Sequence, residues 1–233
     1  MAKPNKFFGN SPNPAVALPA WGMLIMALAL VFLPSLRTAA LILYAADWLA
    51  LGIAALTAKR KQSLVNYWGS CVPIVVAIVL LNFWYRRYTT PWMRNIFLVA
   101  LGFVLLPLPM LLIAEKQVPN MRAGREKYWL RAVALTMLVF LAAMSWAAAS
   151  NIAFDQSAGS LRTACITEKW RNSSRTGGQY HIRVAVEGLA ESLNFDVGRK
   201  AYRRLSEGDA VTATEYPGFW GAPYYTWEIP QSP

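Results

Sequence analysis

The feature that most constrains this chain is an uninterrupted apolar run, Tyr128–Ser150, in which Arg131 is the only charged residue. An α-helix needs about 20 mostly apolar residues to cross the hydrocarbon core of a bilayer. This run is long enough to cross a membrane as one helix. It also separates two parts of different character: apolar runs dominate the chain before it, and a more polar segment follows it.

Four further apolar runs precede this one, and charged or proline-containing segments separate them. We expect five transmembrane helices, at residues 15–36, 39–58, 64–85, 95–114 and 128–150. Pro34 and Arg37 mark the turn between the first two, because proline disfavours helix continuity. Pro107 and Pro109 are expected to kink or shorten the fourth helix. Residues 1–14 are interpreted as a cytoplasmic tail, since the run that follows is too long for a signal peptide.

The net charge of +11 lies entirely in residues 1–150, and residues 151–233 are neutral. A nucleic-acid-binding domain would carry its excess charge on one folded surface, so this distribution argues against nucleic acid as a partner. Basic residues between membrane spans instead mark cytoplasmic loops. With the N-terminus inside, ten basic residues fall in cytoplasmic segments and four fall outside, among them Arg86, Arg87 and Arg94.

This count predicts a multi-pass protein of the plasma (inner) membrane with a cytoplasmic N-terminus. Five spans then place residues 151–233 on the extracytoplasmic, or periplasmic, side. Trp and Tyr residues near the predicted span ends support these boundaries, because their rings favour the interface between lipid and water.

After residue 151 the sequence takes on a period of two, which is typical of strands with one buried face. We expect strands at residues 161–170, 180–186, 193–197, 210–215 and 225–229, a loop at residues 171–178, and a short helix or turn at residues 200–205. About five short strands predict a small all-β domain, barrel-like or a curled antiparallel sheet, because closure hides strand edges. An SH3-like or OB-like shape is compatible with this pattern.

Asp47 is the most unusual single residue of the predicted membrane region. A carboxylate near the middle of a span is energetically costly, and such residues usually face the interior of a helical bundle. Small residues run beside it at a spacing of four: Ala46, Ala50 and Ala54. Such stripes allow helices to approach closely. Polar residues in other spans that could bond to Asp47 are Ser70, Thr136 and Ser145.

Two roles for Asp47 stay open. It is either a structural group that locks two helices together, which we favour, or a proton or cation site of a channel or transporter. Arg131 is expected to extend towards the cytoplasmic interface, with pairing to Asp47 as the alternative.

No pattern of catalytic or metal-binding residues is evident. His181 is the only histidine and has no Cys or carboxylate cluster near it in the sequence, whereas a zinc site needs three or four protein ligands. Alternation places it on the polar, exposed face of its strand. Cys71 and Cys165 are predicted at different depths, so they are not expected to pair, and Cys165 is interpreted as a partly buried strand residue. We expect a protein that is not an enzyme and binds no cofactor.

Two parts of the C-terminal domain are candidate contact surfaces for a protein partner. One is a basic cluster that could contact an acidic partner or anionic lipid headgroups: Arg199, Lys200, Arg203 and Arg204. The alternative for this cluster, which we favour from the sequence, is a solvated face whose charge Glu207 and Asp209 balance. The other is the aromatic segment at residues 216–225, whose candidate contact residues are Phe219, Trp220, Tyr224 and Tyr225. Its aromatic side chains either close one end of the barrel or stand exposed for a partner.

The sequence therefore predicts an integral membrane protein that anchors and presents an extracytoplasmic β domain. Its partners would be membrane lipids and a protein on the extracytoplasmic side. An accessory subunit of an envelope complex and a membrane protein that neutralises a toxin both fit this description. The alternative is a channel or transporter subunit that uses Asp47.

Overall fold

The computed structural model describes residues 14–58, 68–118, 125–174 and 177–228. The predicted cytoplasmic tail lies outside these residues except for Pro14, where the first helix begins. The chain divides into two compact units. The helical unit comprises residues 1–81 and 99–147, and the barrel unit comprises residues 82–98 and 148–233.

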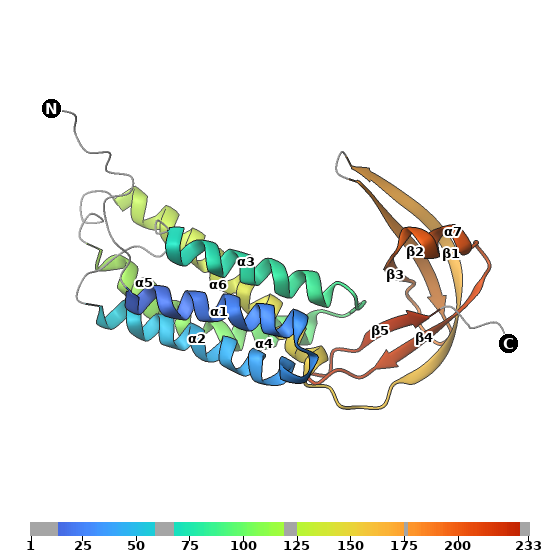
Figure 1. Ribbon diagram of the computed structural model, residues 1–233, viewed down its shortest axis with the longest axis horizontal. Helices are drawn as coiled ribbons and strands as arrows, with labels where there is room; N and C mark the ends of the chain where they lie inside the picture. The colour runs from blue at the N-terminus through green and yellow to red at the C-terminus, as the bar shows by residue number, and fades with distance from the viewer. Residues whose placement is uncertain (1–13, 59–67, 119–124, 175–176, 229–233) are drawn as a thin grey trace. The chain divides into compact units, whose positions relative to one another are not determined.

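The N-terminal part of the chain is helical, as the apolar runs predict (Figure 1). Its elements are α1 (Pro14–Phe32), the 3-10 turn η1 (Pro34–Leu36), α2 (Arg37–Thr57), α3 (Trp68–Tyr85), α4 (Arg94–Val104), α5 (Pro107–Lys116) and α6 (Arg125–Ala153). The first helix ends at Phe32, four residues before the predicted end, because Pro34 begins the 3-10 turn. The guanidinium of Arg37 closes this turn by donating to the carbonyl of Leu30 at 3.2 Å.

The expected fourth span is two helices, α4 and α5, which meet at an angle of 45°. Pro107 begins α5, so the two prolines that predicted a kink do coincide with a break. The helix α5 continues two residues beyond the expected end of the span at residue 114, so Glu115 lies in its last turn.

Among the described residues, three stretches of helix are long and apolar enough to cross a membrane: Ala15–Phe32, Pro34–Thr57 and Tyr128–Ala153. The bent pair α4–α5 gives a fourth if it forms one span. The part of α3 at Cys71–Tyr85 is apolar but shorter than these three stretches. The prediction of five transmembrane helices is therefore not confirmed, whereas membrane embedding of apolar helices is supported.

Helices of the helical unit pack through small side chains and a few large aromatic ones. Ala142, Ala143 and Ala147 of α6 are fully buried, which allows close helix approach. Trp146 of α6 donates its indole N–H to the carbonyl of Leu41 in α2 at 2.8 Å. Large apolar side chains on the outer faces are exposed, including Leu18, Ile25, Ile42, Val79, Leu130 and Met137. An apolar outer face of this kind suits contact with lipid.

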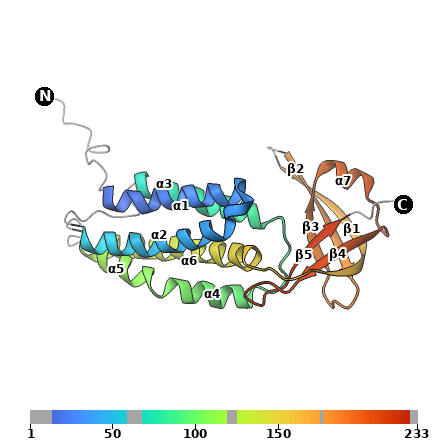
Figure 2. The same cartoon turned by 60° about the horizontal axis from the view of Figure 1, so that its bottom comes forward.

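The C-terminal part of the chain is a five-stranded antiparallel sheet in the order β3-β2-β1-β4-β5 (Figure 2). Its elements are β1 (Ser160–Ser174), β2 (Gly177–Val186), β3 (Leu193–Val197), the short helix α7 (Arg199–Arg204), β4 (Ala210–Tyr216) and β5 (Tyr224–Glu228). The sheet curls into a nearly closed barrel, so the all-β prediction is confirmed. The predicted loop at residues 171–178 is wrong, because β1 and β2 extend through most of it as a long hairpin.

A β-bulge in β1 decides which side chains face the barrel interior. Ile166 pairs with Val184 and the next paired residue is Glu168, opposite Arg183, so Thr167 is the extra residue. An inserted residue reverses the inward and outward alternation of the rest of the strand. Ile166 is therefore buried, whereas Glu168, two residues later, lies exposed on the outer face.

The barrel interior holds one apolar cluster from the inward faces of all five strands. Its fully or almost fully buried members include Ile166, Ile182, Val184, Leu193, Phe195, Val211, Ala213 and Tyr225. Burial of this face leaves the opposite face of each strand available for contacts outside the domain.

Candidate binding site on the barrel unit

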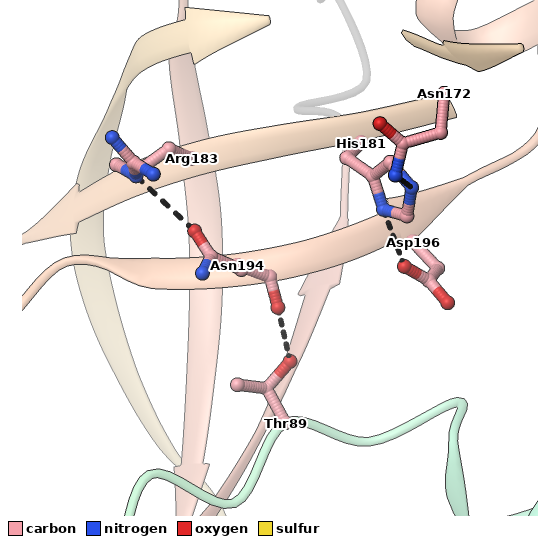
Figure 3. Close-up of polar contacts among 6 residues, drawn as sticks. All are labelled: Thr89, Asn172, His181, Arg183, Asn194 and Asp196. Atoms are coloured by element: carbon pink, nitrogen blue, oxygen red, sulfur yellow. Dashed lines mark hydrogen bonds and ion pairs between the residues drawn. The ribbon is translucent and has the colours of Figure 1, made fainter. Parts of the chain in front are cut away.

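The two edge strands of the sheet, β3 and β5, are joined by a single residue from the segment between α3 and α4. Thr89 donates its backbone N–H to the carbonyl of Tyr225 at 3.1 Å and accepts from the N–H of Tyr225 at 2.8 Å. Its hydroxyl donates to the carbonyl of Asn194 at 2.8 Å (Figure 3). Thr89 thus bonds to both edges of the sheet.

This bridge explains why residues 82–98 belong to the barrel unit and not to the helical one. The ring of Tyr88 also packs edge-on against Tyr224 at 5.6 Å between centroids. An unpaired strand edge invites pairing with other chains, and covering it removes that hazard. No local pattern in the sequence around Thr89 indicates this role, because its partners lie more than 100 residues away.

On the outer face of β1, β2 and β3, charged and aromatic side chains form a continuous row. His181 lies 2.7 Å from the carboxylate of Asp196 through Nδ1 and 3.3 Å from the amide of Asn172 through Nε2 (Figure 3). Its ring stacks on Trp170 at 5.2 Å. The guanidinium of Arg183 lies 5.3 Å from the Trp170 ring centroid, and it also pairs with Glu168.

The structure corrects the expected exposure of His181 and adds one neighbour that the sequence did not indicate. Its side chain is only 13% exposed, because Trp170 and Asn172 cover a ring that alternation alone places at the surface. It also has a carboxylate neighbour, which β3 supplies through the register that sets His181 opposite Asp196. Within the described part of the chain, no group of three or more His, Cys, Asp or Glu side chains is arranged to hold a metal ion.

The predicted basic cluster forms the helix α7, and all four of its cations are exposed: Arg199, Lys200, Arg203 and Arg204. Two carboxylates that follow α7 accept hydrogen bonds from backbone amides, and Asp196, which precedes α7, pairs with His181. Glu207 accepts from the N–H of Lys169 at 3.1 Å, and Asp209 accepts from the N–H of Ser206 at 2.7 Å. Among the described residues, no ion pair neutralises the four cations of α7.

The aromatic segment between β4 and β5 is held by the end of α6. Asn151, only 1% exposed, accepts from the N–H of Trp220 at 2.9 Å and donates to the carbonyl of Ala222 at 2.8 Å. The Trp220 indole donates to the hydroxyl of Ser150 at 2.8 Å. Gly218 adopts φ +74°, and a Cβ there would lie 2.2 Å from the Ala222 carbonyl, so only glycine fits.

This fastening decides between the two interpretations of the aromatic segment. Tyr225 is buried in the barrel core, and Tyr224 is buried with its ring against Tyr88 and Tyr216, so neither side chain is exposed for a partner. Phe219 is 53% exposed and packs edge-on against Phe154 at 5.4 Å. Phe219 therefore remains a candidate contact residue, whereas Trp220 is partly covered and bonded to Ser150.

Burial also changes the acidity of the two tyrosines. Burial, followed by the negative charge of Glu215, raises the pKa of Tyr225 to about 12. Burial and the nearby Asp155 likewise raise the pKa of Tyr224 well above its usual value. Both phenols therefore keep their protons to a higher pH than an exposed tyrosine does.

A pocket of about 340 Å³ opens beside the start of α4. Its lining comes from two segments of the barrel unit and consists of Trp92, Arg94, Asn95, Gly221 and Pro223. The Asn95 amide donates to the carbonyls of Trp220 and Gly221 at 3.2 and 2.9 Å, so it connects the two segments. The aromatic segment at residues 216–225, which the sequence indicated as a candidate contact surface, contributes Gly221 and Pro223 to this pocket. Nothing in the sequence indicates that Arg94 lies beside this segment.

In the helical unit, Asp47 is half-buried and faces α1. A Cβ built at Gly22 would lie 2.5 Å from the Asp47 carboxylate, so the two helices are in close contact at this point. The hydroxyls of Thr136 and Ser145 each donate to a carbonyl of their own helix. The side chain of Ser70 lies outside the described residues.

The structure bears on two further expectations. Arg131 lies 3.9 Å from Glu115 of α5, which is only 2% exposed, so Arg131 has a carboxylate neighbour that the sequence did not indicate. Cys165 was expected to be partly buried, and it is exposed. The basic residues used for the topology lie partly outside the described residues, among them Lys3, Lys6, Lys59, Arg60, Lys61 and Arg122.

Comparison with protein-family models, with curated proteins and with solved structures finds no match to this chain.

Proposed function

We propose that this chain is a non-enzymatic component of the plasma (inner) membrane whose barrel unit binds an acidic partner protein on the extracytoplasmic side. The observation that carries the proposal is the cluster of exposed cations on α7, with which Glu207, Asp209 and Asp196 form no ion pair among the described residues. Complementary charge favours association with an acidic surface and accelerates encounter. A basic surface of this kind is compatible with an accessory subunit of an envelope complex and with a toxin-neutralising protein.

Contacts within the barrel unit support a role as a preorganised binding domain. The barrel follows α6 directly, and Ser150 and Asn151 at the end of that helix hold the segment between β4 and β5. Thr89, which precedes α4, bonds to both sheet edges. A domain held at several points loses less conformational freedom when a partner binds, and this strengthens binding.

The topology is part of the same proposal. In this proposal the segment between α3 and α4 lies on the same side of the membrane as the barrel, and the bonds of Thr89 to β5 and β3 support this. This arrangement requires an even number of crossings between Thr89 and the barrel. The bent pair α4–α5 and the helix α6 satisfy it if α4 and α5 together cross once.

The test is covalent cross-linking and affinity capture of the full-length chain from native membranes. The double variant Arg203→Glu/Arg204→Glu should lose the captured partner, because it reverses two of the cations on α7. The matched control Arg203→Lys/Arg204→Lys keeps the charge and should retain the partner. The variant Asp47→Asn should also retain the partner, because Asp47 contacts only the helical unit in this proposal.

Capture of the same partner in equal amount by the charge-reversed variant would overturn the proposal. A change in co-purified anionic lipid without a change in captured protein would also overturn it, since the cluster would then contact the membrane. Loss of an activity in Asp47→Asn, with assembly intact, would favour the channel or transporter alternative.

A further inference from the structure

The pocket beside α4 has the chemistry of a site for a phosphate group. Its lining contains the cation Arg94 and no carboxylate. An arginine guanidinium can donate two parallel hydrogen bonds to a phosphate, which makes it the preferred side chain for this anion. The Trp92 and Pro223 side chains supply an apolar wall on which a non-polar part of the same ligand can rest.

The walls of the pocket are held in place without a ligand. The Asn95 amide bonds to the carbonyls of Trp220 and Gly221, and the amide of Gly221 donates to the carbonyl of Gly218 at 2.9 Å. Gly221 adopts φ +70°, which favours glycine at this position. A preformed site avoids the entropy loss of ordering its walls upon binding.

The position of the pocket along the chain indicates where the phosphate would come from. Arg94 is the first residue of α4, and α4 with α5 is apolar enough to form one span. The end of a span lies at the level of lipid headgroups, where tryptophan is favoured. Trp92 is 52% exposed, which fits contact with lipid at this level.

We propose that this pocket binds the phosphate headgroup of an anionic membrane phospholipid. Arg94 holds the phosphate, and Trp92 and Pro223 contact the glycerol and the first carbons of the acyl chains. In the proposed orientation, on which this point rests, the role also accounts for a basic residue on the side of the membrane where the positive-inside rule disfavours it. The inference does not depend on any protein partner.

The test is native mass spectrometry of the full-length chain in detergent, titrated with phosphatidylglycerol or with phosphatidylcholine of the same acyl chains. The wild-type chain should bind phosphatidylglycerol more tightly than phosphatidylcholine. Arg94→Gln should weaken phosphatidylglycerol binding about tenfold, the loss expected for one charge-assisted contact. Arg94→Lys should keep part of the affinity.

Arg87→Gln is the matched control. Arg87 is exposed in the same segment, lies over the ring of Phe83, and does not line the pocket. Thermal unfolding without added lipid should be equal in both glutamine variants, which separates binding from folding.

Three results would each overturn the inference. Arg94→Gln could bind phosphatidylglycerol as well as the wild type does. Arg87→Gln could lose as much affinity as Arg94→Gln, which would indicate unspecific attraction to a basic surface. Inorganic phosphate at millimolar concentration could displace the lipid completely, which would assign the site to free phosphate.

Discussion

Tyr225 shows how one residue links burial to the pH dependence of the barrel. Its pKa is about 12 in the folded chain, against the usual value of 10.0. Between these values the unfolded chain loses the phenolic proton and the folded chain keeps it, so the unfolded state binds fewer protons. The free energy of unfolding must therefore fall as the pH rises from 10 to 12.

We expect the unfolding midpoint of the full-length chain to decrease across this interval, measured by thermal unfolding in detergent. Tyr225→Phe keeps the buried ring and removes the titrating group, so its decrease should be smaller. Tyr224 contributes in the same direction, and a residual decrease in Tyr225→Phe is expected. A midpoint that rises with pH in the wild type would contradict this account.

Two neighbouring residues of β2 differ in what they contribute to stability. Ile182 is fully buried in the barrel core, and Ile182→Ala should lower the free energy of unfolding by about 2–5 kcal/mol. His181 lies on the outer face with Asp196, and His181→Ala should cost about 0.5–1.5 kcal/mol, the range for one hydrogen bond. Denaturant unfolding followed by near-ultraviolet circular dichroism measures both. Equal losses would show that the outer-face row is as important for folding as the core.

At the scale of elements, the segment between α3 and α4 links the edge strands β3 and β5 through the hydrogen bonds of Thr89. Thr89→Val keeps the backbone pair with Tyr225 and removes only the hydroxyl bond to Asn194. It should increase amide exchange in β3 and leave β5 protected. Thr89→Pro also removes the N–H that bonds to Tyr225, so exchange should increase in both strands.

Hydrogen exchange by mass spectrometry on the full-length chain resolves the two strands. Thr89→Ser retains every bond of the bridge and serves as the control. Protection of β3 and β5 in Thr89→Pro at the level of the wild type would mean that the barrel is closed without this residue.

The strands also show which structural features a local sequence pattern can predict. The strands β3 and β4 coincide closely with the stretches that alternation predicted, because each is short and regular. The outer position of Trp170 could not be predicted, because the bulge at Thr167 reverses the alternation within β1. A bulge depends on the partner strand, and the sequence of one strand does not contain that information.

At the scale of the whole molecule, the proposed topology predicts that two distant sites are accessible from the same side. Cys165 is exposed on the barrel and is a native thiol for labelling. Arg86→Cys introduces a second thiol in the exposed part of the segment after α3. We expect a membrane-impermeant maleimide to label both positions in intact cells after removal of the outer envelope, and to label neither from the cytoplasmic side.

Cys165→Ser is the background in which Arg86→Cys is measured, so that each signal comes from one exposed thiol. Labelling of the two positions from opposite sides would contradict a single crossing by α4 and α5. Labelling of both only from the cytoplasmic side would reverse the proposed orientation and keep the single crossing.

The sequence by itself determined the features that depend on length and local period. Apolar runs of about 20 residues predicted membrane helices, and alternation after Asn151 predicted a small antiparallel β domain. Pro107 predicted the break between α4 and α5 because proline acts within its own helical turn.

Only the tertiary structure decided which distant residues meet. Thr89 bonds to a strand more than 100 residues away and so links the two edges of the sheet. Asn151 holds the aromatic segment in place. Tyr225 is buried, whereas the sequence alone was equally compatible with an exposed side chain. Each of these contacts depends on strand register and on chain segments remote from one another, and both are set when the whole barrel packs around one core.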